Sequence, residues 1–177
     1  DELASWALGT FAEIMMTERG PRGFYSGGTF TMTAHIYFGA MLGATPDGRK
    51  AGEPIADAIS PRQGFDKNGP TAYLRSAAKL PHLILSNGDQ LNIRFTPSSV
   101  SGDEGAMKLR KLISAYFRLG GMQVQFNVVG TEALRAAQKD PLEYKDLVVR
   151  IAGFSTYFVT LREEIQNDFI TRTEQRM

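Results

Sequence analysis

The chain has 177 residues, its 20 Lys and Arg against 19 Asp and Glu give a formal net charge of +1, and 42% of its residues are hydrophobic. This balance gives no electrostatic case for a nucleic acid or membrane-surface partner, and the length suits one domain with a sizeable core. The absence of cysteine excludes disulfides, thiolate-held iron–sulfur clusters and a cysteine nucleophile within these residues.

The sequence patterns predict neither a transmembrane helix nor an export signal within these residues. No run of about 18 apolar residues occurs, so we expect no transmembrane helix. The chain opens on Asp1 and Glu2 rather than on a basic region followed by an apolar one, so we expect no secretory signal. A helical pattern is already under way at the first residue without a capping signal. We therefore expect a C-terminal piece of a longer protein.

The first third predicts one helix and one strand. Apolar residues recur at helical spacing over residues 3–15, which predicts an amphipathic helix facing a core that includes Trp6. Residues 29–38 are rich in β-branched and aromatic side chains and predict a strand. His35 lies in this segment without a second histidine or a carboxylate at ligand spacing. We therefore expect an interior histidine rather than a metal ligand.

Residues 43–50, GATPDGRK, predict a turn centred on Pro46, Asp47 and Gly48. A phosphate cradle is the alternative, but the glycine spacing matches neither a Walker loop nor a dinucleotide fingerprint. Pro70 predicts the first turn of a helix that continues to about residue 79. His82 follows a proline in an expected loop, and the sequence shows no partner for it.

Two strands are expected in the second half. Residues 91–95 alternate apolar with polar side chains, which predicts a strand with one buried face, and residues 122–129 predict another. Asp103 is a candidate cap for the helix between them, which is expected to end at Gly120-Gly121. Its apolar face is expected to consist of Leu109, Leu112, Ile113, Tyr116 and Phe117.

Two helix starts and one turn are expected after residue 129. Thr131 is a candidate cap for a short helix, and Thr160 with Glu163 forms a candidate capping box for the last helix. Residues 147–158, LVVRIAGFSTYF, predict a buried strand, a tight turn at Gly153 and a return into the core. A glycine at a strand end often serves backbone geometry alone, so a purely structural Gly153 remains one interpretation.

Three strings of the sequence resemble the glycyl radical enzymes. Residues 149–155, VRIAGFS, are similar to the radical-site motif of that family. Residues 43–61, GATPDGRKAGEPIADAISP, and residues 120–129, GGMQVQFNVV, resemble two further strings of the family. The resemblance covers nearly the whole chain and is tightest from residue 43 to residue 173.

The resemblance implies an α/β fold with two parts. Residues 1–54 would form the C-terminal end of the ten-stranded barrel of the pyruvate formate-lyase type, and residues 55–177 would form the glycine radical domain. The strand near Phe30 would then be a late barrel strand, with Phe30 as an apolar wall of the substrate pocket. A plain core position for Phe30 is the alternative.

The resemblance also implies that Gly153 carries a stable radical on its α-carbon. Glycine suits this role because the radical carbon flattens and conjugates with both flanking peptide groups, which a side chain would crowd. Apolar neighbours would shield the radical from water and oxygen. A separate S-adenosylmethionine-dependent, iron–sulfur activase would install the radical, and this chain would bind no cofactor or metal itself.

The radical would next pass to a cysteine, near a glutamate, on a loop that this sequence lacks. The rest of the lyase must supply both residues, so we expect residues 1–177 alone to be inactive. Family resemblance further implies an anaerobic, cytoplasmic homodimer without nucleic acid or membrane partners. Ala152 and Phe154 beside Gly153 favour the dehydratase, decarboxylase and C–C or C–X lyase branch over the pyruvate-cleaving lyases.

Two other functions remain open at the level of sequence. One is a stand-alone glycyl radical subunit that repairs an oxygen-damaged lyase. The segment before residue 55 argues against it, because such a spare part needs only the radical domain. The other is a non-enzymatic α/β domain in which Gly153 is merely structural.

Overall fold

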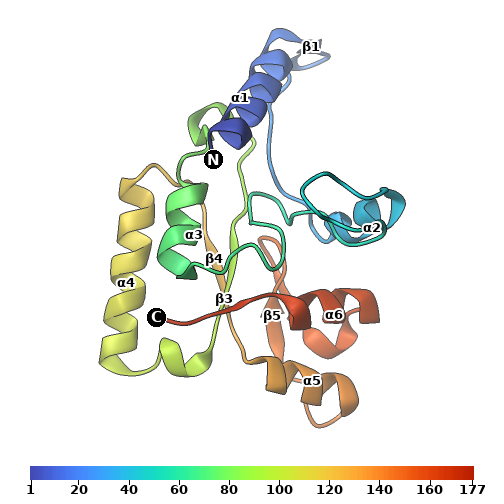
Figure 1. The fold of residues 1–177 in the computed structure, drawn as a ribbon, viewed down its shortest axis with the longest axis vertical. Coiled ribbons are helices and arrows are strands. Elements are labelled where there is room, and N and C mark those ends of the chain that lie inside the picture. The colour runs from blue at the N-terminus through green and yellow to red at the C-terminus, as the bar shows by residue number, and fades with distance from the viewer.

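The computed structural model describes residues 1–177 as a mixed α/β chain (Figure 1). The helices are α1 (Glu2–Thr17), α2 (Ala34–Met41), α3 (Gly69–Ala77), α4 (Gly102–Arg118), α5 (Thr131–Lys139) and α6 (Glu163–Thr171). The strands are β1 (Arg19–Gly20), β2 (Gly23–Phe24), β3 (Asn92–Phe95), β4 (Gln125–Val128), β5 (Val148–Arg150), β6 (Ser155–Tyr157) and β7 (Glu174–Gln175). No helix combines the length and the apolar character needed to cross a bilayer.

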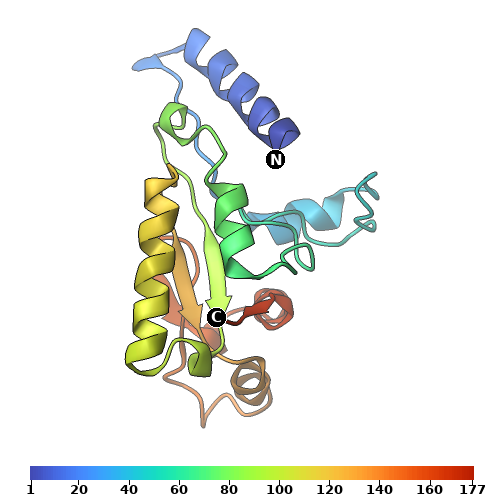
Figure 2. The same ribbon diagram turned by 60° about the vertical axis from the view of Figure 1, so that its left-hand side comes forward.

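A three-stranded parallel sheet in the order β4-β3-β7 lies at the centre. Asn92 is opposite Gln125 and Arg94 is opposite Asn127, so polar residues of β3 and β4 lie side by side. Helices α3 and α4 lie along one side of these strands, whereas β5, α5 and α6 lie on the other (Figures 1 and 2). The sheet therefore separates two different environments.

The face of the sheet toward α3 and α4 is apolar. Ile93 and Phe95 of β3 pack in one buried cluster with side chains of both helices, and Phe126 of β4 packs against it. The rings of Phe95 and Phe126 lie 5.8 Å apart. A second buried cluster joins β5 to α5 and α6.

The alternating pattern of residues 91–95 predicts one buried face, and this part of the prediction is wrong. All four residues of β3 are buried, including Asn92 and Arg94. Buried amides and guanidinium groups need hydrogen-bond partners. The polar face of β3 therefore covers another part of the protein rather than meeting solvent.

The strand expected over residues 29–38 is also wrong, because residues 34–41 form helix α2. Only Thr29 makes a β-bridge, to Asp89. Helix α2 packs so closely on the following segment that a Cβ atom at Gly39 would lie 2.6 Å from the Cα atom of Pro54. Tertiary packing of this kind overrides the β-propensity of threonine and aromatic residues.

The predicted turn at residues 43–50 is confirmed, and it completes the packing of α2. Gly48 has a φ angle of 90°, and its N–H donates to the carbonyl of Thr45. The turn returns Arg49 to the end of α2, where its buried guanidinium donates to the carbonyls of Gly39, Gly43 and Glu53.

Helix α1 has the predicted extent, but within these residues it does not face a core. Leu3 is 74% exposed and Trp6 is 67% exposed, and Ala12 is the one buried residue of the helix. The apolar side of α1 is therefore open to solvent in this chain.

Three predicted helix caps are displaced. Ser101, rather than Asp103, precedes α4, and Gly130 precedes α5. Thr131 instead uses its hydroxyl as an acceptor for Arg94. Arg162 precedes α6, so Thr160 and Glu163 do not form the expected capping box. The stop at Gly120 is confirmed by its φ angle of 99°.

Gly39→Ala is expected to lower the free energy of unfolding by about 1–3 kcal/mol, because the new methyl group has no space against residues 53 and 54. Gly43→Ala is the matched control, since nothing lies within 4 Å of its Cβ position, and we expect a change within about 0.5 kcal/mol. Denaturant unfolding measures both. Equal effects of the two variants would contradict the packing of α2 described here.

Candidate functional site

Gly153 lies in a tight turn between β5 and β6, which we call the glycine turn (residues 151–154). The Ile151 N–H donates to the carbonyl of Phe154 over 3.0 Å and closes the turn. The φ angle of Gly153 is 73°, in the left-handed region. Nothing lies within 4 Å of its Cβ position, so backbone conformation rather than crowding requires glycine there. The predicted strand and turn are thus confirmed.

The environment of the glycine turn is only partly as expected. Val149, Ile151 and Phe158 are buried, but Gly153 itself is exposed and Phe154 is 46% exposed. Tyr157 is also exposed, so the chain returns to the core only at Phe158. Residues 1–177 therefore hold the turn from one side and leave its other side open.

Two side chains of β4, Gln125 and Asn127, hold the glycine turn, and we call them the amide clamp. The Oε1 atom of Gln125 accepts the N–H of Gly153 over 3.1 Å, and its Nε2 atom donates to the carbonyl of Ile151 over 2.9 Å. Asn127 accepts the N–H of Arg150 over 2.8 Å and donates to the carbonyl of Arg150 over 2.9 Å. The clamp thus replaces a ladder between β4 and β5 with side-chain hydrogen bonds.

Neighbouring groups hold the clamp in place. The Nε atom of Arg150 donates to Oε1 of Gln125 over 3.2 Å. Asn92 of β3 accepts the Nε2 donor of Gln125, and Gln90 donates to the carbonyl of Ile151 over 3.3 Å. These buried amides are satisfied by one another and by the turn, so they rigidify the site rather than destabilise it.

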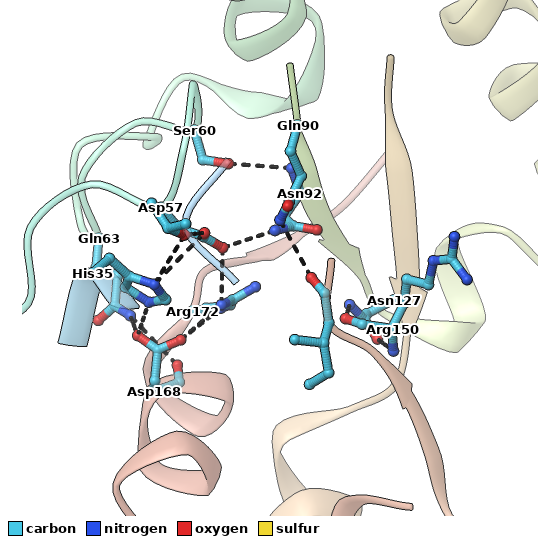
Figure 3. A network of polar contacts seen from close by, with 12 residues as sticks. His35, Asp57, Ser60, Gln63, Gln90, Asn92, Asn127, Arg150, Asp168 and Arg172 are labelled. Atoms are coloured by element: carbon cyan, nitrogen blue, oxygen red, sulfur yellow. Dashed lines mark hydrogen bonds and ion pairs between the residues drawn. The ribbon is translucent and has the colours of Figure 1, made fainter. Parts of the chain in front are cut away.

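A second polar group, the charge cluster, consists of His35, Asp57, Asp168 and Arg172 (Figure 3). His35 Nε2 lies 3.3 Å from Asp168 Oδ1, and its Nδ1 lies 3.6 Å from Asp57 Oδ1. Arg172 Nη2 lies 3.0 Å from Asp57 Oδ2 and 2.7 Å from Asp168 Oδ2. The interior position predicted for His35 is confirmed, and its partners come from distant parts of the chain.

The charge cluster and the amide clamp are joined through Asn92. The Nδ2 atom of Asn92 donates to Asp57 over 2.7 Å, and its backbone N–H donates to Ser60 Oγ over 3.1 Å (Figure 3). Tyr73 donates its hydroxyl to the carbonyl of Asn92 over 2.5 Å, and burial raises the pKa of Tyr73, which keeps it a neutral donor. A continuous path of ion pairs and hydrogen bonds therefore runs from α2 and α6 to the glycine turn.

Charge within the cluster changes the acidity of its members. Burial raises the pKa of Asp168, but the contact with His35 and the charge of Arg172 outweigh burial and hold the pKa below 3.8. A cavity of about 40 Å³ lies beside the cluster, with Arg94, Tyr73 and Asn127 among its lining residues. Burial lowers the pKa of Arg94.

His82 also differs from its sequence prediction, because it has a partner. His82 is buried in a 3₁₀ turn, its Nδ1 atom contacts Asp89, and its Nε2 atom lies 2.9 Å from the carbonyl of Ala77. Burial lowers the pKa of His82, but the hydrogen bond and the charge of Asp89 outweigh it and raise the pKa above 6.5. This pair lies outside both the clamp and the charge cluster.

Of the two residues singled out from the sequence, only Gly153 lies in this network. Phe30 is about half exposed, and its ring packs closely over Gly28. No sequence pattern assigns a role to Gln125, Asn127, Asn92 or Asp168. Gln125, Asn127 and Asn92 could have been found from the sequence, because each is a polar residue that alternates with apolar residues along a predicted strand.

Comparison with known proteins relates this chain to one family of enzymes. A family model described as glycine radical matches residues 55–159. Trans-4-hydroxy-L-proline dehydratase of Clostridioides difficile is 48% identical over 143 residues, which cover 81% of this chain and 18% of that protein. Probable dehydratase YbiW of Escherichia coli K12 is 38% identical over 185 residues, which cover 100% of this chain and 23% of that protein.

A solved structure of another such enzyme resembles this chain closely. The glycerol-bound B12-independent glycerol dehydratase from Clostridium butyricum matches with a TM-score of 0.96 and 46% identity, over 99% of this chain and 22% of that chain. This chain therefore spans about a fifth of the length of these relatives. The matched part is mixed α/β, and the ten-stranded barrel is not contained in residues 1–177.

Asp168→Asn is expected to lower the free energy of unfolding by about 3–5 kcal/mol at pH 7, because His35 and Arg172 lose a buried anionic partner. The folded-state pKa of Asp168 lies below its unfolded value of about 3.9, so the contribution is complete above that pH and disappears as the pH falls through the folded-state pKa. The difference in free energy of unfolding between Asp168→Asn and the wild type should therefore be constant from pH 7 to about pH 5 and should narrow as the pH falls below about 3.9.

Glu104→Gln is the control, because Glu104 pairs with Lys108 at the surface of α4 and should matter little at any pH. A constant difference between Asp168→Asn and the wild type down to pH 3 would show that the carboxylate charge is not what stabilises the cluster.

Proposed function

The chain belongs to the glycyl radical enzyme family, and we propose that Gly153 is the residue that stores the radical. The observation that carries the proposal is the position of Gly153 at the tip of a hairpin, with its N–H fixed by Gln125 and its Cβ side free of atoms within 4 Å. The family match over residues 55–159 includes this position. The open side is where a hydrogen-donating group can reach the α-carbon.

The chemistry assigned to Gly153 is a hydrogen-atom transfer. The S–H bond of a cysteine breaks, its hydrogen atom joins the α-carbon of Gly153, and the unpaired electron moves to sulfur as a thiyl radical. The reverse transfer restores the glycine radical at the end of turnover. No metal bound to this chain takes part in these steps.

Residues 1–177 contain no cysteine, so another part of the protein supplies the thiol. We assign the cysteine and its neighbouring glutamate to the portion of the lyase outside these residues. The exposed apolar side chains around the turn, Val148, Phe154 and Tyr157, are suited to packing against that portion. Such packing would close the open side of Gly153 and exclude water and oxygen.

Installation of the radical requires a second protein. We propose a radical S-adenosylmethionine activase, which carries its own iron–sulfur cluster and removes one hydrogen atom from Gly153. The chemistry of a stored radical also implies an anaerobic setting, and family resemblance supports a cytoplasmic homodimer.

The reaction class that fits best is the lyase branch that eliminates water or another group from carbon. Ala152 and Phe154 beside Gly153 support this branch, and both curated relatives described above are named as dehydratases. Phe30 remains our candidate for an apolar wall of the substrate pocket.

We place the domain boundary at residues 54 and 55. The family match starts at residue 55, and residues 1–54 include the exposed apolar side of α1, which suits contact with a barrel. A relative aligned over 100% of this chain includes both parts, which favours a segment of a lyase over a stand-alone repair subunit.

Anaerobic activation of the complete protein should give a doublet in the electron paramagnetic resonance spectrum, and Gly153→Ala should abolish it because a side chain crowds the planar radical centre. Gly130→Ala is the matched control, since nothing lies within 4 Å of its Cβ position and its φ angle is −80°. A doublet that survives in Gly153→Ala, or is absent from the wild type, would exclude Gly153 as the radical residue.

Residues 1–177 expressed alone and treated with activase should form no product from glycerol or trans-4-hydroxy-L-proline, because the chain has no thiol. Product formation is measured by chromatography, with the complete lyase as the positive control. Turnover by the isolated segment would refute the assignment of the cysteine to another part of the protein.

A further inference from the structure

The function proposed above uses the amide clamp only to hold the N–H of Gly153, although the clamp lies in the string QFNVV that resembles the family. Gln125 uses its carboxamide fully: Oε1 accepts from Gly153 over 3.1 Å and from Arg150 over 3.2 Å, and Nε2 donates to Ile151 over 2.9 Å and to Asn92. Both lone pairs and both protons of the amide are thus engaged. The buried side chain of Gln125 therefore contacts Gly153 directly.

The hydrogen bond from Gly153 N–H fixes the peptide group on the amino side of the α-carbon. A radical carbon conjugates with that group only when φ is roughly 180° or 0°, where the planar peptide group and the radical centre are coplanar. The φ angle of Gly153 is 73°, so the backbone must rotate when the radical forms. Because Gln125 holds the amino-side group, the rotation falls on the carboxyl side of Gly153.

The same hydrogen bond changes the electronic properties of the Gly153 nitrogen. Acceptance of an N–H proton by a carbonyl oxygen polarises the amide and raises the electron density on nitrogen. Nitrogen next to a radical carbon donates density into the half-filled orbital, so a richer nitrogen takes a larger share of the spin. The donor from Arg150 orients the Gln125 oxygen toward the turn.

We propose that Gln125 is a positioning residue for the radical, which fixes the amino-side peptide group of Gly153 and raises the spin density on its nitrogen. Asn127 supports this role by holding the backbone of Arg150 on both its N–H and its carbonyl. The proposal rests on the proposed function, because it requires a radical at Gly153.

The test uses the complete lyase labelled with 15N-glycine and activated anaerobically. The readouts are the amount of radical per chain and the 15N hyperfine coupling of the radical, measured by electron–nuclear double resonance. Gln125→Met removes all four hydrogen bonds at similar volume. We expect about two- to tenfold less radical, the factor that one net hydrogen bond represents, together with a smaller 15N coupling.

Gln125→Glu keeps an oxygen acceptor for Gly153 and pairs its charge with Arg150, so the 15N coupling should stay at or above the wild-type value. Gln166→Met is the control, because Gln166 is also a buried glutamine, but its amide donates to the carbonyls of Phe158 and Leu161, outside the glycine turn. It should leave the 15N coupling unchanged, since a general loss of stability does not alter spin distribution.

The outcomes separate the two proposals. A wild-type doublet together with unchanged radical yield and unchanged 15N coupling in Gln125→Met overturns the role of Gln125 and leaves Gly153 in place. A silent wild type overturns the proposed function instead. If Gln125→Met does not fold, the Gln125→Glu variant tests the proposal instead. A 15N coupling in Gln125→Glu below the wild-type value would contradict it.

The wild-type enzyme gives an independent measurement that needs no variant. In D2O the amide of Gly153 becomes N–D, and the deuterium quadrupole coupling in the radical reports the hydrogen bond to Gln125. We expect the value of a hydrogen-bonded amide. The value of a free amide would overturn the proposal.

Discussion

The glycine turn depends on one constraint, which is that the polar face of β3 and β4 must satisfy its buried amides. Asn92, Gln125 and Asn127 are all buried, and a buried amide without a partner destabilises a protein by about 1–3 kcal/mol. The backbone of residues 150–153 supplies the missing partners. The turn and the sheet therefore stabilise each other, and neither is complete without the other.

The path from this sheet to α2 and α6 gives the turn a rigid base. Asn92 contacts both Gln125 and Asp57, and Asp57 pairs with Arg172, which extends from the end of α6. Helix α2 contributes His35 to the same cluster. Segments that lie far apart in the sequence are thereby tied to the strand that holds Gly153. This rigidity on one side contrasts with the open side of the turn.

The sequence predicted those features that depend on local patterns. The hairpin at Gly153, the turn at Gly48 and the end of α4 at Gly120 each require a positive φ angle that glycine supplies, and all three are confirmed. The secondary structure of residues 29–38 could not be predicted from the local sequence, because it depends on the close contact of Gly39 with residues 53 and 54.

The network around the turn was equally hidden from the sequence, for a different reason. Asp168 and His35 are separated by most of the chain, and only folding brings them together. The alternating pattern of residues 91–95 predicts one buried face, which leaves Asn92 on the solvent side, and the strand predicted over residues 122–129 gives its amides no role. In a sheet buried on both faces, polar residues at alternate positions mark a site instead.

Three features of the chain bear on the proposed function: a backbone held by side chains, an exposed α-carbon and the absence of a thiol. Gly153 has no atom within 4 Å of its Cβ position, its neighbours Phe154 and Tyr157 are exposed, and no cysteine occurs in the chain. Together they support the proposal that Gly153 is one half of a reaction centre whose other half lies outside these residues.

Mass spectrometry of the activated enzyme after exposure to oxygen tests the central claim most directly, because oxygen adds to a carbon-centred radical and breaks the chain at that residue. The account predicts a single new break at Gly153, with one fragment ending beside Ala152 and the other beginning near Phe154. A chain that stays intact, or that breaks at another glycine, would contradict it.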